Sequence, residues 1–398
     1  MALDLDREYD LPEEAATWRA QAARFAADVL APLAREADRE GRFSRDVVEQ
    51  LGAAGLIGAG LPVEAGGGGA SMLAACAIAE EIGVVDGSAR GFLAVQAGLV
   101  LAPLVQAAPE ALRVAWAERL AAGTAIGAFG LTEPEAGSDV GSMRTSIRED
   151  GDDVVIDGEK VWITNGGVAD VLLIFGQTDP ARKTKGLECY LVTPDMPGLT
   201  RRPMAGRELG HRASDHAHLV FDGLRVPKAN RIGAARGGMA VAMLGLEDGR
   251  LNVAAGAVGI HRACLEASVA FARARRQFGK RIGDFQQVGA TLAEMDMTLR
   301  ASRLMVHHAA RLKDRGLPND HAVSAAKLHA TEAALEAATR AIQLHGSRGY
   351  TDEFPLERYW RDVMALTIYE GTSNIQRVIL ARMLLGRDEQ RGREGKQA

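Results

Sequence analysis

The stretch DDVVIDGEKVWITNG (Asp152–Gly166) differs in amino-acid pattern from the more distant sequence on both sides, and this difference predicts the fold. β-Branched residues dominate the stretch and Asp-Gly turns interrupt it, which is the pattern of strands joined by tight turns. The segments GLECYLVTPDMPGLTRRPM (Gly186–Met204) and DHAHLVFDGLRVP (Asp215–Pro227) continue in the same style. We therefore expect residues 123–231 to form a middle antiparallel β domain.

The sequence on either side of this segment is typical of helices. Residues 1–122 are rich in Ala, Leu, Arg and Glu, and the same composition returns from residue 232 to residue 398. The chain is therefore predicted to be an α+β protein. An N-terminal helical domain (1–122) and a C-terminal helical bundle domain (232–398) enclose the middle β domain.

Two apolar stripes in the C-terminal part are expected to form the core of the bundle. The first has a spacing of three and four residues and the second recurs every seven residues. Their members are Val288, Leu292, Met295 and Leu299, and then Leu328, Leu335 and Ile342.

The bulk composition limits the class of protein. The chain has 398 residues, 47% hydrophobic and 25% charged, with a net charge of -5, which argues against a dedicated nucleic-acid binder. Its 3 cysteines show no CxxC spacing, so neither a disulfide framework nor a metal site is expected. The acidic N-terminus does not resemble a signal peptide, and no uncharged apolar stretch is expected to span a membrane. A cytoplasmic protein is the expectation.

The stretch LTIYEGTSNIQR (Leu366–Arg377) places one carboxylate, Glu370, immediately before a predicted helix. Ser373 and Gln376 have the S-x-x-Q spacing of a capping box, which predicts that the helix begins there. The helix dipole favours the ionised carboxylate and apolar neighbours disfavour it. Glu370 is therefore either a general base tuned towards neutral pH or a solvated glutamate before a helix.

Five motifs, taken in order, resemble those of the acyl-CoA dehydrogenase family of flavoenzymes. They are FGLTEPEAGSDV (Phe129–Val140), KVWITNG (Lys160–Gly166), RRQFGKRIGDFQ (Arg275–Gln286), QLHGSRGY (Gln343–Tyr350) and IYEGTSNIQR (Ile368–Arg377). The resemblance covers nearly the whole chain, including the order of helical, β and helical segments.

This resemblance implies an FAD-dependent oxidation of an acyl-CoA thioester to the 2-enoyl-CoA. Glu370 matches the base that removes the Cα proton while hydride leaves Cβ for the flavin N5. Its backbone N–H, at the turn with Gly371, would help bind the thioester oxygen. Some relatives carry the base on a long helix instead, at a position that matches Gly249, with Glu247 and Asp248 beside it as possible displaced bases.

The resemblance also assigns the FAD-binding and substrate-binding residues. The flavin set is Phe129, Leu131, Thr132, Gly137, Ser138, Trp162, Thr164, Thr372 and Asn374. A further set serves FAD held by a neighbouring subunit, namely Arg275, Phe278, Gln343, Gly346 and Ser347, although Ser347 stands where relatives often have glycine. The substrate set is Ser138, Arg250, Gly371 and Arg90.

Shared FAD sites imply an oligomer, and the family is usually a homotetramer built as a dimer of dimers. Electrons then pass to electron-transfer flavoprotein. Two alternatives share the fold or part of it: an acyl-CoA oxidase or flavin monooxygenase, and a non-catalytic relative that binds nucleic acid.

Arg90 raises a question of substrate. Its R-x-x-x-x-V-Q context, Arg90 to Gln96, is similar to that of glutaryl-CoA dehydrogenases, in which an arginine at the end of the acyl pocket binds a distal carboxylate. Alternatively, Arg90 turns to solvent or pairs with Glu80, Glu81 or Asp86. A pocket acid of those relatives is replaced here by Gly83, which counts against the glutaryl-type interpretation. Because of Arg90, a short dicarboxylyl-CoA substrate is an alternative to a plain fatty acyl-CoA.

Overall fold

The computed structural model describes residues 9–386. The chain divides into two units, each assembled from separate segments. The helical unit contains residues up to Arg19, Met72–Gly87 and residues from Arg250 onward, and the sheet unit contains Ala20–Ser71 and Ser88–Gly249. The boundaries between the units fall inside three helices, α2 (Glu13–Phe25), α6 (Gly87–Leu93) and α9 (Gly238–Ala274), and immediately before α5 (Met72–Val85).

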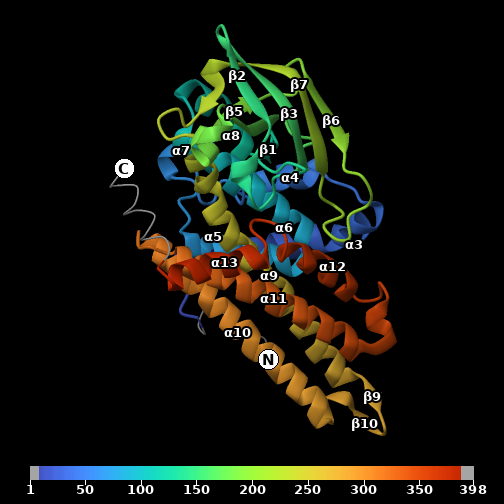
Figure 1. Cartoon of the computed structure of the whole chain (residues 1–398). Helices are drawn as coiled ribbons and strands as arrows, with labels where there is room; N and C mark the ends of the chain where they lie inside the picture. Colours follow the sequence, from blue (N-terminus) through green and yellow to red (C-terminus); the bar gives the residue numbers. More distant parts are fainter. Residues whose placement is uncertain (1–8, 387–398) are drawn as a thin grey trace. The chain divides into compact units, whose positions relative to one another are not determined.

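The sheet unit is built around the predicted β segment (Figure 1). Its strands follow the order β6-β7-β3-β2-β4-β5-β8, and β1 pairs with β4. The strands are β1 (Gly127–Gly130), β2 (Ser146–Asp150), β3 (Asp153–Thr164), β4 (Val171–Gln177), β5 (Leu187–Val192), β6 (Leu199–Pro203), β7 (His216–Pro227) and β8 (Arg231–Ile232).

The sheet is mixed, whereas the sequence predicted a purely antiparallel one. β1 pairs with β4 in parallel over Gly127–Gly130, and β2 also meets β4 in parallel at Ser146. The remaining pairs are antiparallel. Parallel neighbours need a long connection between the strands, and turn residues in the sequence identify only the short antiparallel hairpins.

The helices of the sheet unit include one long apolar stretch, Gly87–Ala107. It comprises α6 (Gly87–Leu93), the π-helical η3 (Ala94–Leu101) and α7 (Ala102–Ala107). By length and composition alone this stretch, which includes Arg90, could cross a membrane, and an 18-residue window of it has a mean hydropathy of 1.5. However, 72% of that window is buried within the protein, as expected of a core helix.

Gln96 fixes this stretch to the sheet. Its side chain is 0% exposed, and its Nε2 donates to the carbonyls of Leu120 (3.0 Å) and Ala125 (2.8 Å). Its Oε1 accepts from the Gly127 N–H at 2.8 Å. The three bonds satisfy the buried amide and hold the start of β1.

The sheet unit also contains the helices α3 (Ala31–Glu40), α4 (Arg45–Ala53) and α8 (Glu110–Ala121).

The helical unit is a bundle with a small hairpin. Its elements are α5 (Met72–Val85), the C-terminal part of α9, β9 (Arg276–Gln277), β10 (Lys280–Arg281), α10 (Gln286–Asp314), α11 (Asp320–His345), α12 (Leu356–Leu366) and α13 (Ser373–Leu384). α10 and α11 lie side by side (Figure 1).

The predicted core stripes of the bundle are only partly correct. Met295 and Leu299 of α10 are buried, but Val288 and Leu292 are half-buried. Along α11, Leu328, Leu335 and Ile342 are all half-buried. The buried face of α11 consists mostly of alanines, which are Ala326, Ala330, Ala334, Ala337, Ala338 and Ala341. Small side chains let neighbouring helices approach closely, so the larger residues are displaced towards the margins of the contact.

Gly83 of α5 shows the same close packing. A Cβ atom at this position would lie 2.8 Å from the Gly256 carbonyl oxygen of α9. Any larger side chain at residue 83 would therefore push the two helices apart.

A buried network of charges lies among α5, α9 and α10. Arg303 donates to Glu80 from Nε (3.1 Å) and NH2 (2.8 Å), and Arg262 donates to Glu81 from NH1 (2.9 Å) and NH2 (2.6 Å). Although burial raises the pKa of Glu80, the two arginines lower it to about 2 overall.

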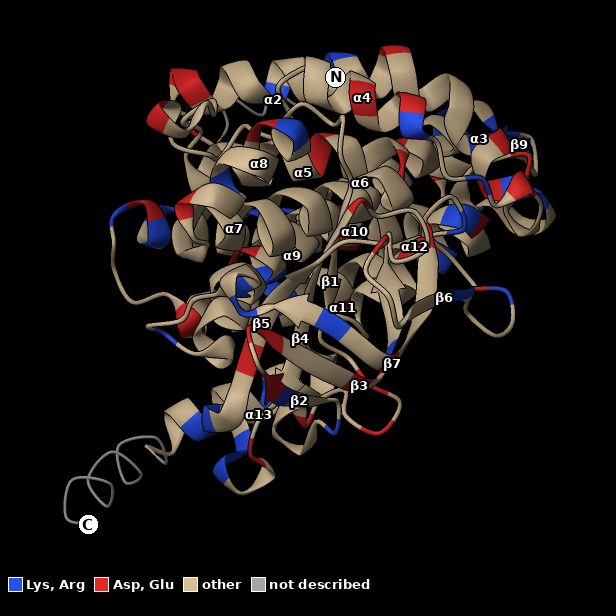
Figure 2. Ribbon diagram, turned by 90° about the horizontal axis from the view of Figure 1, so that it is seen from above, with Lys and Arg blue, Asp and Glu red and all other residues tan. Residues whose placement is uncertain are grey.

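Outside this network, acidic and basic residues are interspersed along the chain (Figure 2).

Candidate active site

Glu370 lies on a tight turn between α12 and α13. Glu370 and Gly371 both have positive φ, 52° and 88°. The Ile368 N–H donates to the Ala365 carbonyl at 2.9 Å, and the Ser373 N–H donates to the Thr367 carbonyl at 2.9 Å. A glutamate in the left-handed region is uncommon and costs free energy, so the surrounding contacts must hold it there.

The start of α13 differs from the predicted capping box. The N-cap is Thr372, whose hydroxyl accepts from the Ile375 N–H at 3.1 Å. Gln376 is buried and reaches back to the turn, where its Nε2 donates to the Gly371 carbonyl at 3.1 Å. The prediction of a Ser373–Gln376 capping box is therefore wrong, because the adjacent threonine takes the capping position.

Lys327 of α11 is a residue of the site that the motifs did not identify. It is 0% exposed, and its Nζ donates to the Gly371 carbonyl at 2.8 Å. Burial lowers the pKa of Lys327 to about 8, the Glu370 charge opposes this shift, and the Arg250 charge adds to it. The charges of Glu370 and Arg250 thus both act on Lys327 within the helical unit. The signal in the sequence was a lysine on the alanine-rich face of a predicted core helix.

In the sheet unit, a buried ion pair holds the loop that the resemblance assigns to the flavin. Lys160 of β3 is 0% exposed, and its Nζ donates to Glu133 Oε1 at 2.7 Å and to the Leu131 carbonyl at 3.1 Å. The Glu133 carboxylate also accepts from the N–H groups of Arg144 (2.6 Å) and Thr145 (2.9 Å). Burial lowers the pKa of Lys160 to about 8, and Glu133 opposes this shift. The motif residues Leu131 and Thr132 are thereby fixed against β3.

Trp162 lies on an irregularity of β3. The register between β3 and β7 shifts between Lys160 and Ile163, and Trp162 has a φ of 59°. Its indole is 54% exposed as a result. Bulges next to active sites commonly redirect a side chain, and here the bulge presents a flat apolar surface that suits an aromatic ring.

The other flavin residues of the sheet unit fall into two groups. Phe129 is buried against Phe175, with ring centroids 4.8 Å apart, and Leu131 is also buried. Gly137 and Ser138 are exposed in the loop after Glu133, and a Cβ atom at Gly137 would meet nothing within 4 Å. Thr132 and Thr164 are half-buried. This unit therefore offers small residues, hydroxyl groups and an exposed indole, which fit a flavin cofactor.

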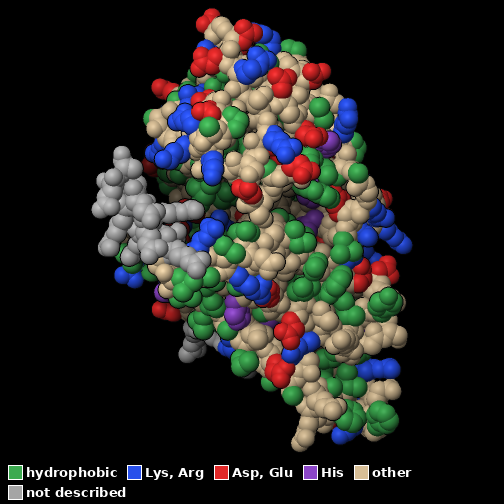
Figure 3. Space-filling model, in the orientation of Figure 1, with side chains coloured by type: hydrophobic (Ala, Val, Ile, Leu, Met, Phe, Trp, Pro, Cys, Tyr) green, Lys and Arg blue, Asp and Glu red, His purple; other side chains and the backbone are tan. Residues whose placement is uncertain are grey.

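The residues assigned to a neighbouring subunit's FAD are all exposed. Arg275 and Phe278 belong to the segment of hairpin β9–β10, and Phe278 is 93% exposed. Hydrophobic and basic side chains are visible at the tip of this hairpin (Figure 3). Gln343, Gly346 and Ser347 lie at the end of α11. These two places are adjacent, since Phe271 and His345 stack with centroids 4.2 Å apart.

The remaining predicted residues are also located. Arg250 is half-buried, as are Glu247 and Asp248 beside the buried Gly249 on α9. Thr372 is half-buried and Asn374 is exposed. Arg90 is 1% exposed, so it does not turn to solvent. Within the described residues, no cluster of three or more His, Cys, Asp or Glu side chains could hold a metal ion.

Three family models match the chain in succession. The N-terminal domain of acyl-CoA dehydrogenase matches residues 12–124, the middle domain matches 128–224, and the C-terminal domain matches 236–385. The short-chain specific acyl-CoA dehydrogenase of Clostridium acetobutylicum is 36% identical over 94% of this chain and 98% of its own length.

Solved structures agree with these sequence matches. Butyryl-CoA dehydrogenase from Megasphaera elsdenii matches with a TM-score of 0.91 and 33% identity, over 94% of this chain and 99% of its own. Glutaryl-CoA dehydrogenase from Mycobacterium smegmatis gives 0.90 and 32%, over 94% and 95%. A chain in a structure of the electron transferring flavoprotein of Acidaminococcus fermentans gives 0.91 and 35%, over 94% and 98%. The chain therefore belongs to the acyl-CoA dehydrogenase family of FAD-binding oxidoreductases.

Proposed function

We propose that this protein oxidises an acyl-CoA thioester to the 2-enoyl-CoA, with Glu370 as the base, and passes the electrons to an electron-transfer flavoprotein. The observation that carries the assignment of the base is the Glu370–Gly371 turn. Donors from α11 and α13 hold the Gly371 carbonyl, so the backbone that carries the carboxylate keeps its two positive φ angles. A match to a chain in an electron transferring flavoprotein structure supports the electron acceptor.

The chain's own residues have distinct tasks in this reaction. Glu370 removes the proton from Cα, and its N–H donates to the thioester oxygen as negative charge develops there. When bound, FAD supplies the acceptor for the hydride that leaves Cβ. Trp162 would pack against the isoalloxazine, while Thr132, Ser138 and Thr164 would donate hydrogen bonds to the cofactor. Arg250 would bind the CoA portion, as its charge suits a phosphate.

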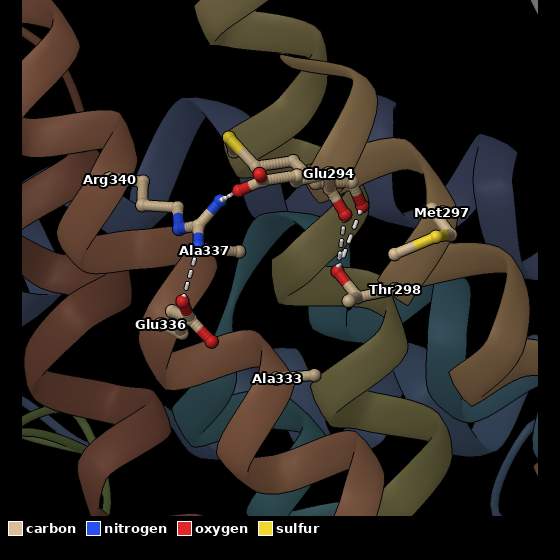
Figure 4. Close-up of a pocket in the computed structure, with 8 residues that line it drawn as sticks. Glu294, Met297, Thr298, Ala333, Glu336, Ala337 and Arg340 are labelled. Carbon is tan, nitrogen blue, oxygen red and sulfur yellow. Dashed lines mark hydrogen bonds and ion pairs between the residues drawn. The ribbon is translucent and has the colours of Figure 1, made fainter. Parts of the chain in front are cut away.

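An oligomer is part of the proposal, and the outer faces of α10 and α11 support it. Met297 and Leu304 of α10 are 62% and 56% exposed, and Leu328 and Leu335 of α11 are half-buried. A groove of about 240 Å³ runs between the two helices (Figure 4). Arg340 bridges Glu294 and Glu336 at its edge. Burying these apolar side chains against another copy would remove them from water, and the homotetramer of the family is the proposed assembly.

Replacement of Arg275 by alanine tests the shared cofactor site. We expect Arg275→Ala to weaken FAD retention while the melting temperature of the apoprotein stays unchanged, since the side chain is exposed. Flavin absorbance measured along a size-exclusion profile gives FAD content and oligomer size together. Arg273→Ala, an exposed arginine at the end of α9, is the matched control and should retain FAD. A monomer carrying a full complement of FAD would contradict the shared site.

The reaction itself is tested by a panel of acyl-CoA substrates. Anaerobic mixing of the FAD-loaded protein with its substrate should bleach the flavin absorbance and yield the 2-enoyl-CoA. Subsequent exposure to air distinguishes the alternatives, because an acyl-CoA oxidase or flavin monooxygenase would be reoxidised rapidly by oxygen. The proposed dehydrogenase instead requires electron-transfer flavoprotein or a dye. Failure of every acyl-CoA to reduce the flavin would refute the proposed function.

A short dicarboxylyl-CoA is a second candidate substrate, and the matches to glutaryl-CoA dehydrogenase structures support it. Arg90 is 1% exposed, and its guanidinium would bind the distal carboxylate of such a substrate. If this candidate is correct, the wild type will prefer glutaryl-CoA to butyryl-CoA and isobutyryl-CoA, and Arg90→Ala will reverse that order. Measuring kcat/KM for the three substrates with the wild type and with Arg90→Ala shows which substrate each protein prefers. An unchanged preference for uncharged substrates in both proteins would make Arg90 a structural residue.

A further inference from the structure

Lys327 is a fully buried cation whose position calls for an explanation. It is 0% exposed and shares a helix face with Ala326, Ala330 and Ala334. A buried ammonium is destabilising unless nearby groups compensate for its charge. Its hydrogen bond goes to the Gly371 carbonyl, 2.8 Å away, which belongs to the Glu370 turn. A structural contact alone could be made by a neutral donor at lower cost.

The Gly371 carbonyl is held from two sides. Lys327 of α11 and Gln376 of α13 both donate to it, at 2.8 Å and 3.1 Å, so both of its lone pairs are used. Glycine is favoured at 371 because its φ of 88° lies in the left-handed region, and a Cβ atom there would also displace the Gln376 Nε2, which would be 2.6 Å away. Together, the two donors maintain a backbone conformation that Glu370 would not otherwise favour.

Lys327 also acts on Glu370 through its charge. The pKa of Lys327 is lowered to about 8, because burial and Arg250 lower it more than Glu370 and Glu332 raise it. The ammonium is therefore mostly charged at neutral pH. Glu332 already pairs with Arg377 at 2.7 Å, which leaves Glu370 as the catalytic carboxylate on which the charge acts. A neighbouring positive charge favours the ionised form of a carboxylate, which is the form a base requires.

From this geometry we infer that Lys327 is a positioning residue for catalysis. It holds the Gly371 carbonyl so that the Glu370 carboxylate and N–H keep their orientation, and it places a positive charge beside that turn. This inference rests on the proposed function, since it concerns the base of that reaction.

The test compares Lys327→Met and Lys327→Gln with the wild type, all loaded with FAD. Methionine removes the donor and the charge, whereas glutamine keeps a donor and removes only the charge. We expect kcat at pH 7 to fall about tenfold or more with KM changed little, because Lys327 is buried and its hydrogen bond goes to the turn. The acidic limb of the pH profile of kcat/KM should move to higher pH by about one unit in both variants.

Gln376→Leu is the matched control, because it removes a donor to the same carbonyl without removing a charge. It should lower kcat and leave the acidic limb in place. An acidic limb that stays at the wild-type pH in both Lys327 variants would overturn the inference. Loss of FAD or of the folded state in both Lys327 variants would also overturn the inference, since it would assign Lys327 a role in folding alone.

The outcome for Lys327 can be separated from the outcome for the proposed function. If Glu370→Gln is inactive and the Lys327 variants behave as the wild type, the reaction stands and the inference fails. If Glu370→Gln remains active, the assignment of the base fails whatever Lys327 does.

Discussion

Replacement of Glu370 by glutamine is expected to lower the rate of acyl-CoA dehydrogenation by about 10²–10⁴-fold, the usual contribution of a general base. Glutamine has nearly the same shape as glutamate but cannot accept the Cα proton. The positive φ of residue 370 and the donors on Gly371 remain available, so the turn should persist. The protein should stay yellow, with FAD content equal to that of the wild type. Single-turnover bleaching of the flavin under anaerobic conditions measures the loss directly.

Glu247→Gln is the control for this experiment. Glu247 is half-buried on α9, next to the Gly249 position where some relatives carry the base. Its replacement should leave activity within a few-fold of the wild type. If Glu247→Gln or Asp248→Asn removes activity and Glu370→Gln does not, the base lies on α9 and the Glu370 assignment is wrong.

Replacement of Glu80 by glutamine is expected to have the largest effect on stability. Glu80 accepts hydrogen bonds from Nε and NH2 of Arg303, whose side chain is 1% exposed, and lies 3.4 Å from Arg262. Removing one partner of a buried pair leaves an uncompensated charge, which costs about 3–5 kcal/mol. Denaturant unfolding of the FAD-loaded protein, followed by far-UV circular dichroism, measures this change in the free energy of unfolding.

Glu80 also makes the stability of the folded protein depend on pH. The pKa of Glu80 is lowered to about 2 in the folded state from a model-compound value of 4.5. Its contribution to stability is therefore fully present above about pH 4.5 and is lost as the pH falls towards 2. Glu149→Gln serves as the control, because its ion pair with Lys228 is exposed and should contribute little. Equal stability of Glu80→Gln and Glu149→Gln would show that the buried network does not stabilise the fold.

The sequence alone was enough for the order of the domains and for the family. The β-branched segment around Asp152–Gly166 predicted the sheet, and the helical composition on both sides predicted the bundle. These are local signals, since period, turn residues and motifs are all properties of neighbouring residues. Glu370 could be singled out for the same reason, because its Y-E-G-T context is contained within a few residues.

Contacts between distant segments could be seen only in the tertiary structure. The parallel pairing of β1 with β4, the half-buried position of the Leu328 stripe and the capping by Thr372 each depend on elements remote in sequence or on a choice between adjacent residues. Lys327 is 43 positions from Glu370 in the chain, by their residue numbers, yet it acts on the same turn. The sequence therefore determined which residue types are present and where the elements form. Only packing decided which side chain supports Glu370, because the free energy of burying a charge depends on the partners that the fold brings to it.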